Sequence, residues 1–282
     1  MKKIVFVMPN KGFSGAEKVV IQIINGIKDV YDCYYISQSG MIDCYLKENN
    51  IKHVITEKNL DRKELKKILN NLCPDIVVAT DYRASVITAT IKGKYKLISH
   101  LHNNPSWIKK ININSLIFAL VSVKFNKIFI VSESIRTEFI FNKFIKNKFC
   151  LVSNPLCRED ILKQDTKRYE KIYDVSFIGR FCEQKDPEKF IKIIRKIKDK
   201  GISIKSLMMG DGSWNGRVAE WIKYYGLEND IELKAFEKNP FPYFKKSKII
   251  VMPSKFEGFG LVAYEAMCFG VPVIACPVRR IS

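Results

Sequence analysis

The sequence contains no uninterrupted apolar run long enough to cross a bilayer. Its most apolar later stretch, residues 115–131, is interrupted by Lys124, Asn126 and Lys127, whereas a membrane-spanning helix needs about 20 mostly apolar residues. The first residues, M-K-K-I-V-F-V-M-P, begin like a signal peptide, but the run breaks at Pro9 with no small-residue cleavage site behind it. We therefore expect a buried first strand and no membrane-spanning segment.

Paired cysteines are also missing. The eight cysteines form no C-x-x-C pair and no spacing typical of zinc ligands. Most lie in or beside apolar runs, which is typical of reduced core cysteines in a cytosolic protein. We therefore expect neither a disulfide framework nor a metal site, and we expect a cytoplasmic location.

Acidic residues are few, with 29 Asp and Glu against 48 Lys and Arg and a formal net charge of +19. The excess is uneven, because residues 92–148 contain eleven Lys and Arg but only Glu133 and Glu138. Eight aromatic residues are interleaved with these charges. One interpretation is a lysine-rich composition with solvated helix faces; the other is a surface that binds anionic lipid or an anionic acceptor.

A nucleic-acid partner is not expected from this charge. No helix-turn-helix, RNA-recognition or zinc-finger pattern accompanies it. A peripheral attachment to the inner face of the cell membrane is the interpretation that we pursue.

The first half of the chain alternates short apolar runs with helical patterns. The runs are continuous and β-branched, as in Ile76-Val77-Val78, which favours strands buried on both faces of a parallel sheet. A helix is expected over 112–124 and another over 133–144. Alternation of this kind predicts a doubly wound α/β domain. The expected strands are 3–8, 33–37, 52–56, 75–79, 95–100, 127–131 and 149–152.

The pattern ends at Asn154-Pro155 and begins again near residue 174. We expect a first Rossmann-like domain over 1–155, a charged and irregular linker over 156–173, and a second Rossmann-like domain over 174–282. Ligands bind in open α/β sheets at the carboxyl ends of the strands. A cleft lined by such ends is therefore expected to hold the ligand. The strands expected in the second domain are 174–179, 203–209, 230–234, 248–252 and 271–275.

The most informative stretch reads P-S-K-F-E-G-F-G-L-V-A-Y-E-A-M and begins at Pro253. It follows a predicted strand, turns through two glycines and opens a helix. Backbone amides at such a helix start lack intrahelical partners and are suited to bind a diphosphate. Gly258, Phe259, Gly260 and Leu261 are the residues expected to contact it.

Two carboxylates, Glu257 and Glu265, flank this helix start. With a rise of 1.5 Å per residue they would lie roughly 8–12 Å apart. A retaining glycosidase pair needs about 5 Å, so this spacing suits two ends of one extended ligand better.

The stretch E-G-F-G-L-V-A-Y-E-A-M, followed by G-V-P-V-I-A, resembles the Glu-x7-Glu signature of the large retaining glycosyltransferase family numbered four. The resemblance implies a GT-B fold with two Rossmann-like domains facing a cleft. It also implies transfer of a sugar from a nucleoside-diphosphate sugar to a hydroxyl acceptor with retention of configuration. Glu257 would contact the donor sugar, and Glu265 would bind the nucleotide ribose.

Upstream, G-R-F-C-E-Q-K resembles the family's G-R-x4-K pattern, with Arg180 and Lys185 as its cations. Two fixed cations would neutralise a departing diphosphate. Gly210 begins a G-D-G sequence that resembles the family's G-x-G loop, for which we expect a tight turn close to the nucleotide base.

In the first domain, G-F-S-G-A-E resembles the family's Gly-Gly-Ala-Glu loop, which closes over the donor phosphate, and places Gly15 there. It fails the spacing of a dinucleotide fingerprint. His102, followed by Asn103, matches the family's cleft histidine, whereas His100 is expected to be structural.

The resemblance implies an enzyme without a metal or other cofactor, and no Asp-x-Asp motif occurs in the chain. The expected partners are a nucleotide sugar, a glycan or lipid-linked acceptor, and an anionic membrane surface. The sequence departs from the family's pattern after Cys276, where further elements are normal. We therefore expect a C-terminal truncation. Two alternatives stay open: a nucleotide-sugar-binding remnant without turnover, and a basic membrane-associated module.

Overall fold

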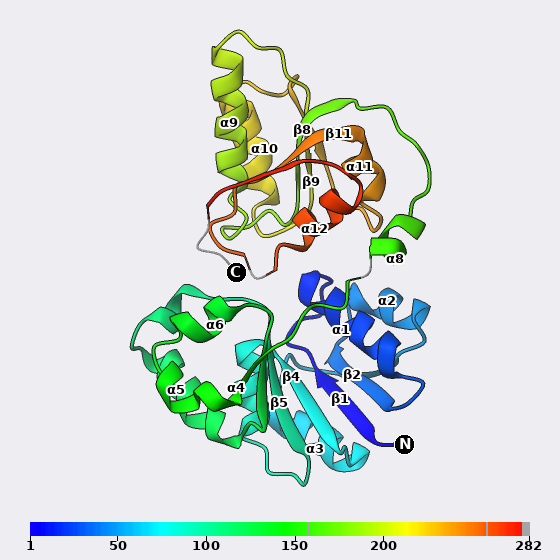
Figure 1. Cartoon of the computed structure of the whole chain (residues 1–282), viewed down its shortest axis with the longest axis vertical. Coiled ribbons are helices and arrows are strands. Elements are labelled where there is room, and N and C mark those ends of the chain that lie inside the picture. Colours follow the sequence, from blue (N-terminus) through cyan, green and yellow to red (C-terminus); the bar gives the residue numbers. More distant parts are fainter. Residues whose placement is uncertain (157, 258, 278–282) are drawn as a thin grey trace. The chain divides into compact units, whose positions relative to one another are not determined.

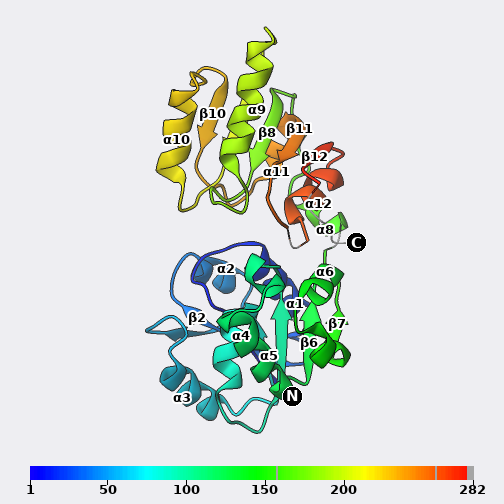
Figure 2. The same ribbon diagram turned by 90° about the vertical axis from the view of Figure 1, so that its left-hand side faces the viewer.

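The computed structural model of the chain describes residues 1–156, 158–257 and 259–277. They form two compact units, with the boundary in the chain between Pro155 and Leu156. Figure 1 colours both units along the sequence, and Figure 2 gives a second view of each. None of the helices in the described ranges combines the length and the apolar character that a bilayer span requires.

The first unit is built on a seven-stranded sheet with the order β3-β2-β1-β4-β5-β6-β7. Every neighbouring pair is parallel, as the continuous apolar runs predict. The strand order reverses between β1 and β4. The strands are β1 (Lys3–Val7), β2 (Asp32–Gln38), β3 (Lys52–Thr56), β4 (Ile76–Thr80), β5 (Lys96–Leu101), β6 (Lys127–Ile130) and β7 (Phe149–Leu151).

Helices cover both faces of this sheet. Successive residues of β1 enter different cores, because Val5 packs with α3, α4 and α5 on one face whereas Phe6 packs with α1 and α2 on the other. The helices are α1 (Gly15–Ile27), α2 (Ile42–Glu48), α3 (Arg62–Leu72), α4 (Asp81–Ala89), α5 (Ile113–Val121), α6 (Glu133–Glu138) and α7 (Asn142–Ile145), with 3-10 turns η1 (Ser106–Lys109), η2 (Ser122–Lys124) and η3 (Lys146–Lys148).

The second unit repeats the plan with five parallel strands in the order β10-β9-β8-β11-β12. Its strands are β8 (Tyr173–Ile178), β9 (Ser206–Met209), β10 (Ile231–Lys234), β11 (Ser247–Met252) and β12 (Val273–Ala275). Helices α9 (Pro187–Asp199) and α10 (Asn215–Tyr224) cover one face. Helices α8 (Arg158–Lys163), α11 (Phe241–Lys246) and α12 (Leu261–Cys268) cover the other face, as Figure 1 shows.

Two expectations from the sequence differ from the structure. The helix expected over 133–144 is interrupted, because Phe139 is extended and buried, and the amide of Ile140 donates to the carbonyl of Ile108 at 3.0 Å. The segment expected to be irregular, residues 156–173, contains helix α8. Ile161 of this helix is buried beside Phe244 in the core of the second unit. In both places tertiary packing decides the local structure.

Candidate functional site

Two loops of the second unit meet at the carboxyl ends of the neighbouring strands β8 and β11. The ammonium of Lys185, in the loop after β8, lies 2.6 Å from a carboxylate oxygen of Glu257, in the loop after β11. Only 16% of the lysine side chain and 11% of the glutamate side chain are exposed. Because the pair is mostly shielded from water, it is screened less than a surface ion pair.

Gln184 ties the same two loops together. Its side-chain amide nitrogen donates to the backbone carbonyl of Phe256 at 3.2 Å. Its backbone carbonyl accepts from the backbone amide of Lys255 at 2.8 Å. The side-chain oxygen of Gln184 accepts a hydrogen bond from the guanidinium of Arg180 at 3.0 Å. Arg180 itself is exposed. The structure therefore brings Arg180, Lys185 and Glu257 into one cluster.

A third loop, after β9, packs against the loop after β8. A Cβ atom on Gly212 would lie 2.3 Å from the carbonyl oxygen of Phe181. The amide of Phe181 donates to the carbonyl of Asp211 at 2.9 Å, and the amide of Trp214 donates to the carbonyl of Phe181 at 3.0 Å. The glycines of this loop, Gly210 and Gly212, are therefore needed for close approach of two backbones.

In the sequence, helix α12 begins shortly after Glu257, with Gly260 as its N-cap. Gly260 has φ of 76° and ψ of 48°, a left-handed conformation that favours glycine. The first hydrogen bonds of the helix run from Ala263 and Tyr264 to the carbonyl of Gly260. The amide of Leu261 precedes them and belongs to the donors that a helix start leaves for a ligand.

The remaining residues of this motif differ in exposure. Phe259 is 37% exposed and Glu265 only 6%. A carboxylate so deeply buried needs hydrogen-bonding partners. Gly258, which the motif also suggests as a contact, lies outside the described residues.

In the first unit, His100 lies near the end of strand β5 and His102 directly follows the strand, with the two ring centroids 4.0 Å apart. The Nε2 atom of each is buried and has no hydrogen-bond partner within the described part of the chain. Burial lowers the pKa of His100 to about 4. Burial and, as a smaller cause, the neighbouring His100 lower the pKa of His102 well below its usual range. Both rings are therefore neutral near pH 7.

Sequence reasoning missed Asp81, which holds the backbone of His102. Its carboxylate accepts a hydrogen bond from the amide of His102 at 3.2 Å. Asp81 has φ of 65°, an unusual conformation for a residue other than glycine. The position of Asp81, immediately after β4 and hence beside the end of β5, is the signal that could have revealed it.

Gly15 is the first residue of α1. Glu17 of the same motif is buried, and its carboxylate accepts from the amide of Ser14 at 2.9 Å. This contact is half of a capping box, which fixes the start of the helix. The carboxylate of Glu17 is therefore engaged in holding the start of α1.

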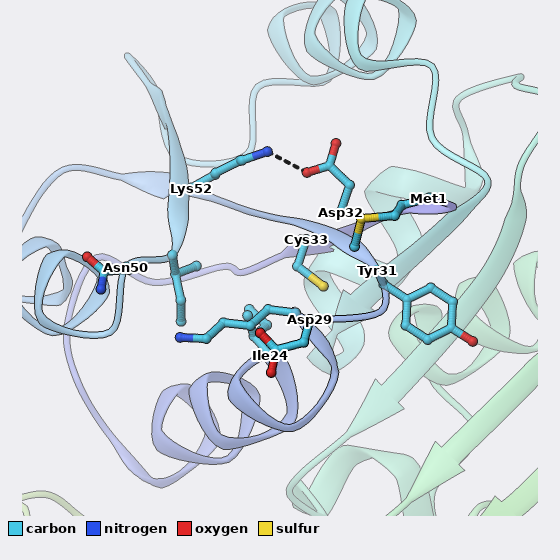
Figure 3. Close-up of a pocket in the computed structure, with 10 residues that line it drawn as sticks. Met1, Ile24, Asp29, Tyr31, Asp32, Cys33, Asn50 and Lys52 are labelled. Carbon is cyan, nitrogen blue, oxygen red and sulfur yellow. Dashed lines mark hydrogen bonds and ion pairs between the residues drawn. The ribbon is translucent and has the colours of Figure 1, made fainter.

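The first unit also has a hollow of about 470 Å³ at the opposite, amino end of its strands. Figure 3 shows Lys52 and Asp32 there, joined at 2.6 Å. The hydrogen bond from Lys52 lowers the pKa of Asp32. Because ligands of such sheets bind at the carboxyl ends, this hollow is no candidate for the donor. In the described ranges, no group of three or more His, Cys, Asp or Glu is placed to hold a metal ion.

Residues 158–281 match the model of a protein family described as glycosyl transferases group 1. An uncharacterized glycosyltransferase of Methanocaldococcus jannaschii is 30% identical over 232 residues, which are 74% of this chain and 57% of that protein. An O-antigen biosynthesis glycosyltransferase of Escherichia coli is 22% identical over 292 residues, which are 96% of this chain and 79% of that protein. The chain thus spans little more than half of the first relative.

A solved structure shares the fold along the whole chain. It is the Anabaena protein HepE in complex with UDP and glucose, with a TM-score of 0.82 and 18% identity, covering 99% of this chain and 81% of that one. The chain therefore has the GT-B fold. Residues 158–281 are similar to the group 1 glycosyltransferases.

Proposed function

We propose that this protein transfers a sugar from a nucleoside-diphosphate sugar to a hydroxyl group of an acceptor, with retention at the anomeric carbon. The observation that carries the proposal is the shielded pair of Lys185 and Glu257 at the carboxyl ends of β8 and β11, directly before the start of α12. This is the edge of an α/β sheet at which nucleotides bind.

The diphosphate is the part of the donor that these groups suit. Arg180 is exposed beside the pair, and the α12 start adds backbone donors that favour an anion. Charge develops on the diphosphate as the sugar leaves, and fixed cations stabilise it without reorganising. We propose that Arg180, Lys185 and the helix start fulfil this role without a bound cofactor.

The two carboxylates receive different parts of the donor in this proposal. Lys185 occupies one oxygen of Glu257 and so orients the second oxygen, which can accept from a sugar hydroxyl. Glu265 lies in the second turn of α12, which begins at Leu261, and is buried. It is assigned to the ribose hydroxyls, which donate to a carboxylate in a charge-assisted bond.

The first unit supplies the acceptor side. His102 presents a buried neutral imidazole whose Nε2 is unsatisfied within the described residues. Such an atom hydrogen-bonds a hydroxyl group without adding charge. Gly15 offers backbone at the start of α1 for the donor phosphate. We propose a glycan or lipid-linked acceptor, supported by the role of the Escherichia coli relative in O-antigen biosynthesis.

Two measurements test the proposal: the binding of nucleotides and the anomeric configuration of the transfer product. Titration calorimetry with UDP, GDP and their glucose and mannose conjugates should show binding of at least one nucleotide, and thermal stability should rise with its concentration. Lys248→Ala is the matched control for Lys185→Ala, because Lys248 pairs with Asp174 at 2.8 Å at the other end of β11. Absence of any nucleotide binding would overturn the proposal. A product of inverted configuration would overturn retention alone.

A further inference from the structure

Helix α5 of the first unit is apolar on the side that faces solvent as well as on the side that faces the core. Its inner side carries Phe118, whose ring lies 4.8 Å from that of Tyr82 and 5.6 Å from that of Phe139. Because the inner side already fills the core, the sequence has no packing reason to place large apolar residues on the outer side.

Ile113, Leu116 and Leu120 are exposed on that outer side, Ile113 by 67% and Leu120 by 64%. Their spacing of three and four residues places them on one helix face. Val123, in the turn η2, and Ile111, just before the helix, are exposed as well. These five residues form what we term the α5 surface. A contiguous exposed apolar surface marks an interaction site.

A hollow of about 440 Å³ adjoins the start of the helix. Trp107, Lys110, Ile111 and Ile113 are among the residues that line it. An indole and a lysine at the edge of an apolar face are the residues that settle at the boundary between acyl chains and headgroups.

The charge of this region is predominantly positive. No Asp or Glu occurs in the sequence between Asp81 and Glu133. Lys110, Lys127, Lys143 and Lys146 are exposed. Lys109 pairs with Glu138 at 3.0 Å, and Lys124 donates to the carbonyl of Ala89 at 2.9 Å.

Lys148, by contrast, turns its ammonium inward to the carbonyls of Ser122, Val123 and Phe125 at 3.0, 2.6 and 2.8 Å. It closes the end of η2 and so fixes Val123 at the end of the apolar face.

We propose that the α5 surface inserts into the headgroup region of an anionic lipid bilayer, with the surrounding lysines bound to lipid phosphates. Charge complementarity selects this occupant, because a predominantly basic rim beside a narrow apolar strip matches an anionic bilayer. In combination with the proposed function, the contact brings the acceptor side of the protein to a lipid-linked acceptor.

Co-sedimentation of the full chain with vesicles tests the proposal. Vesicles of phosphatidylcholine with 30 to 40% phosphatidylglycerol should bind the protein, and pure phosphatidylcholine should bind it at least tenfold more weakly. The variant I113N/L116N/L120N should lose about tenfold or more in binding. The variant K110Q/K143Q/K146Q should lose about 10- to 100-fold and should show a smaller dependence on salt.

Matched controls lie in the same unit. Val30 and Ile55 are exposed apolar residues, so V30N/I55N tests for a general loss of apolar surface. Lys63, Lys66 and Lys67 of α3 are exposed, so K63Q/K66Q/K67Q removes the same charge elsewhere. Both controls should bind vesicles like the unchanged protein.

Three results would overturn the proposal: binding that is indifferent to lipid charge, equal losses in test and control variants, or absence of vesicle binding combined with self-association that I113N/L116N/L120N abolishes. The last would assign the α5 surface to a second copy of the chain. Nucleotide calorimetry on the same variants keeps the two proposals separate. Vesicle binding without nucleotide binding would refute the proposed function only.

Discussion

A Cβ atom on Gly210 would lie 1.9 Å from the carbonyl oxygen of Gly179, so the ends of β9 and β8 touch backbone to backbone. Gly210→Ala should force them apart and cost about 1–3 kcal/mol of unfolding free energy, the usual cost of overpacking. Chemical denaturation measures it. The control is Gly216→Ala, because a Cβ on Gly216 meets nothing within 4 Å; this helical position should become no less stable. Equal losses of stability in both variants would show that the close approach of Gly210 to Gly179 is not the cause.

Glu265 and Glu257 should separate nucleotide binding from sugar binding. Glu265→Gln keeps the volume of the buried side chain but removes its charge, and should weaken binding of the bare nucleoside diphosphate by about 1.5–3 kcal/mol. Glu257→Gln should weaken mainly the sugar-bearing donor. Calorimetry with UDP and UDP-glucose compares the two. If both substitutions weakened UDP equally, the roles assigned to the two carboxylates would be wrong.

Lys185 should affect the rate of transfer more than the affinity for the donor, since only an interaction that strengthens in the transition state accelerates the chemistry. Lys185→Ala should reduce kcat by about 10²–10³, with a smaller change in KM. The double variant K185A/E257A should lose less than the sum of the single losses, because the two side chains form one pair. A variant K185A that kept most of its turnover would exclude this role.

The buried histidines should make the fold sensitive to mild acid. The folded pKa of His100 is lowered to about 4, so between pH 6.5 and 4 the unfolded chain binds a proton that the folded chain excludes. Stability should therefore fall as the pH falls through this window, by on the order of 3 kcal/mol for this residue.

Denaturation midpoints measured from pH 7 to 4 would show the effect, and His100→Gln should flatten the profile. His53→Gln is the comparison. Burial lowers the pKa of His53 as well, so this variant measures the contribution of a buried histidine in β3, away from the end of β5. An unchanged profile in His100→Gln would mean that other groups carry the acid sensitivity.

The central strands could be predicted because strands such as β1 and β4 are continuous apolar runs with a core on both sides. Val5 and Phe6 illustrate the reason, since neighbouring residues of one strand enter opposite cores. The break at Phe139 could not be predicted, because it depends on the distant carbonyl of Ile108. For the same reason α8 was not expected, since Ile161 is helical where it meets α12 and Phe244.

At the candidate site, the motifs identified which residues matter but not how they pair. Arg180 and Lys185 were expected to bind a departing diphosphate. In the structure Lys185 forms an ion pair with Glu257, and Arg180 donates a hydrogen bond to Gln184. A linear sequence contains no information on which carboxylate neutralises which ammonium. Asp81 was missed because it contacts the backbone of His102, so that only its position directly after β4 marks it and no pattern of residue types does.

The pairing of Lys185 with Glu257 spans 72 residues of chain, although β8 and β11 are neighbours in the sheet. Contacts of such separation form late, because the intervening chain must be ordered first. Synthesis proceeds from the N-terminus, so a ribosome-bound chain carries this lysine long before the carboxylate that neutralises it. Until β11 has emerged and joined β8, the ammonium of Lys185 lacks the carboxylate of Glu257.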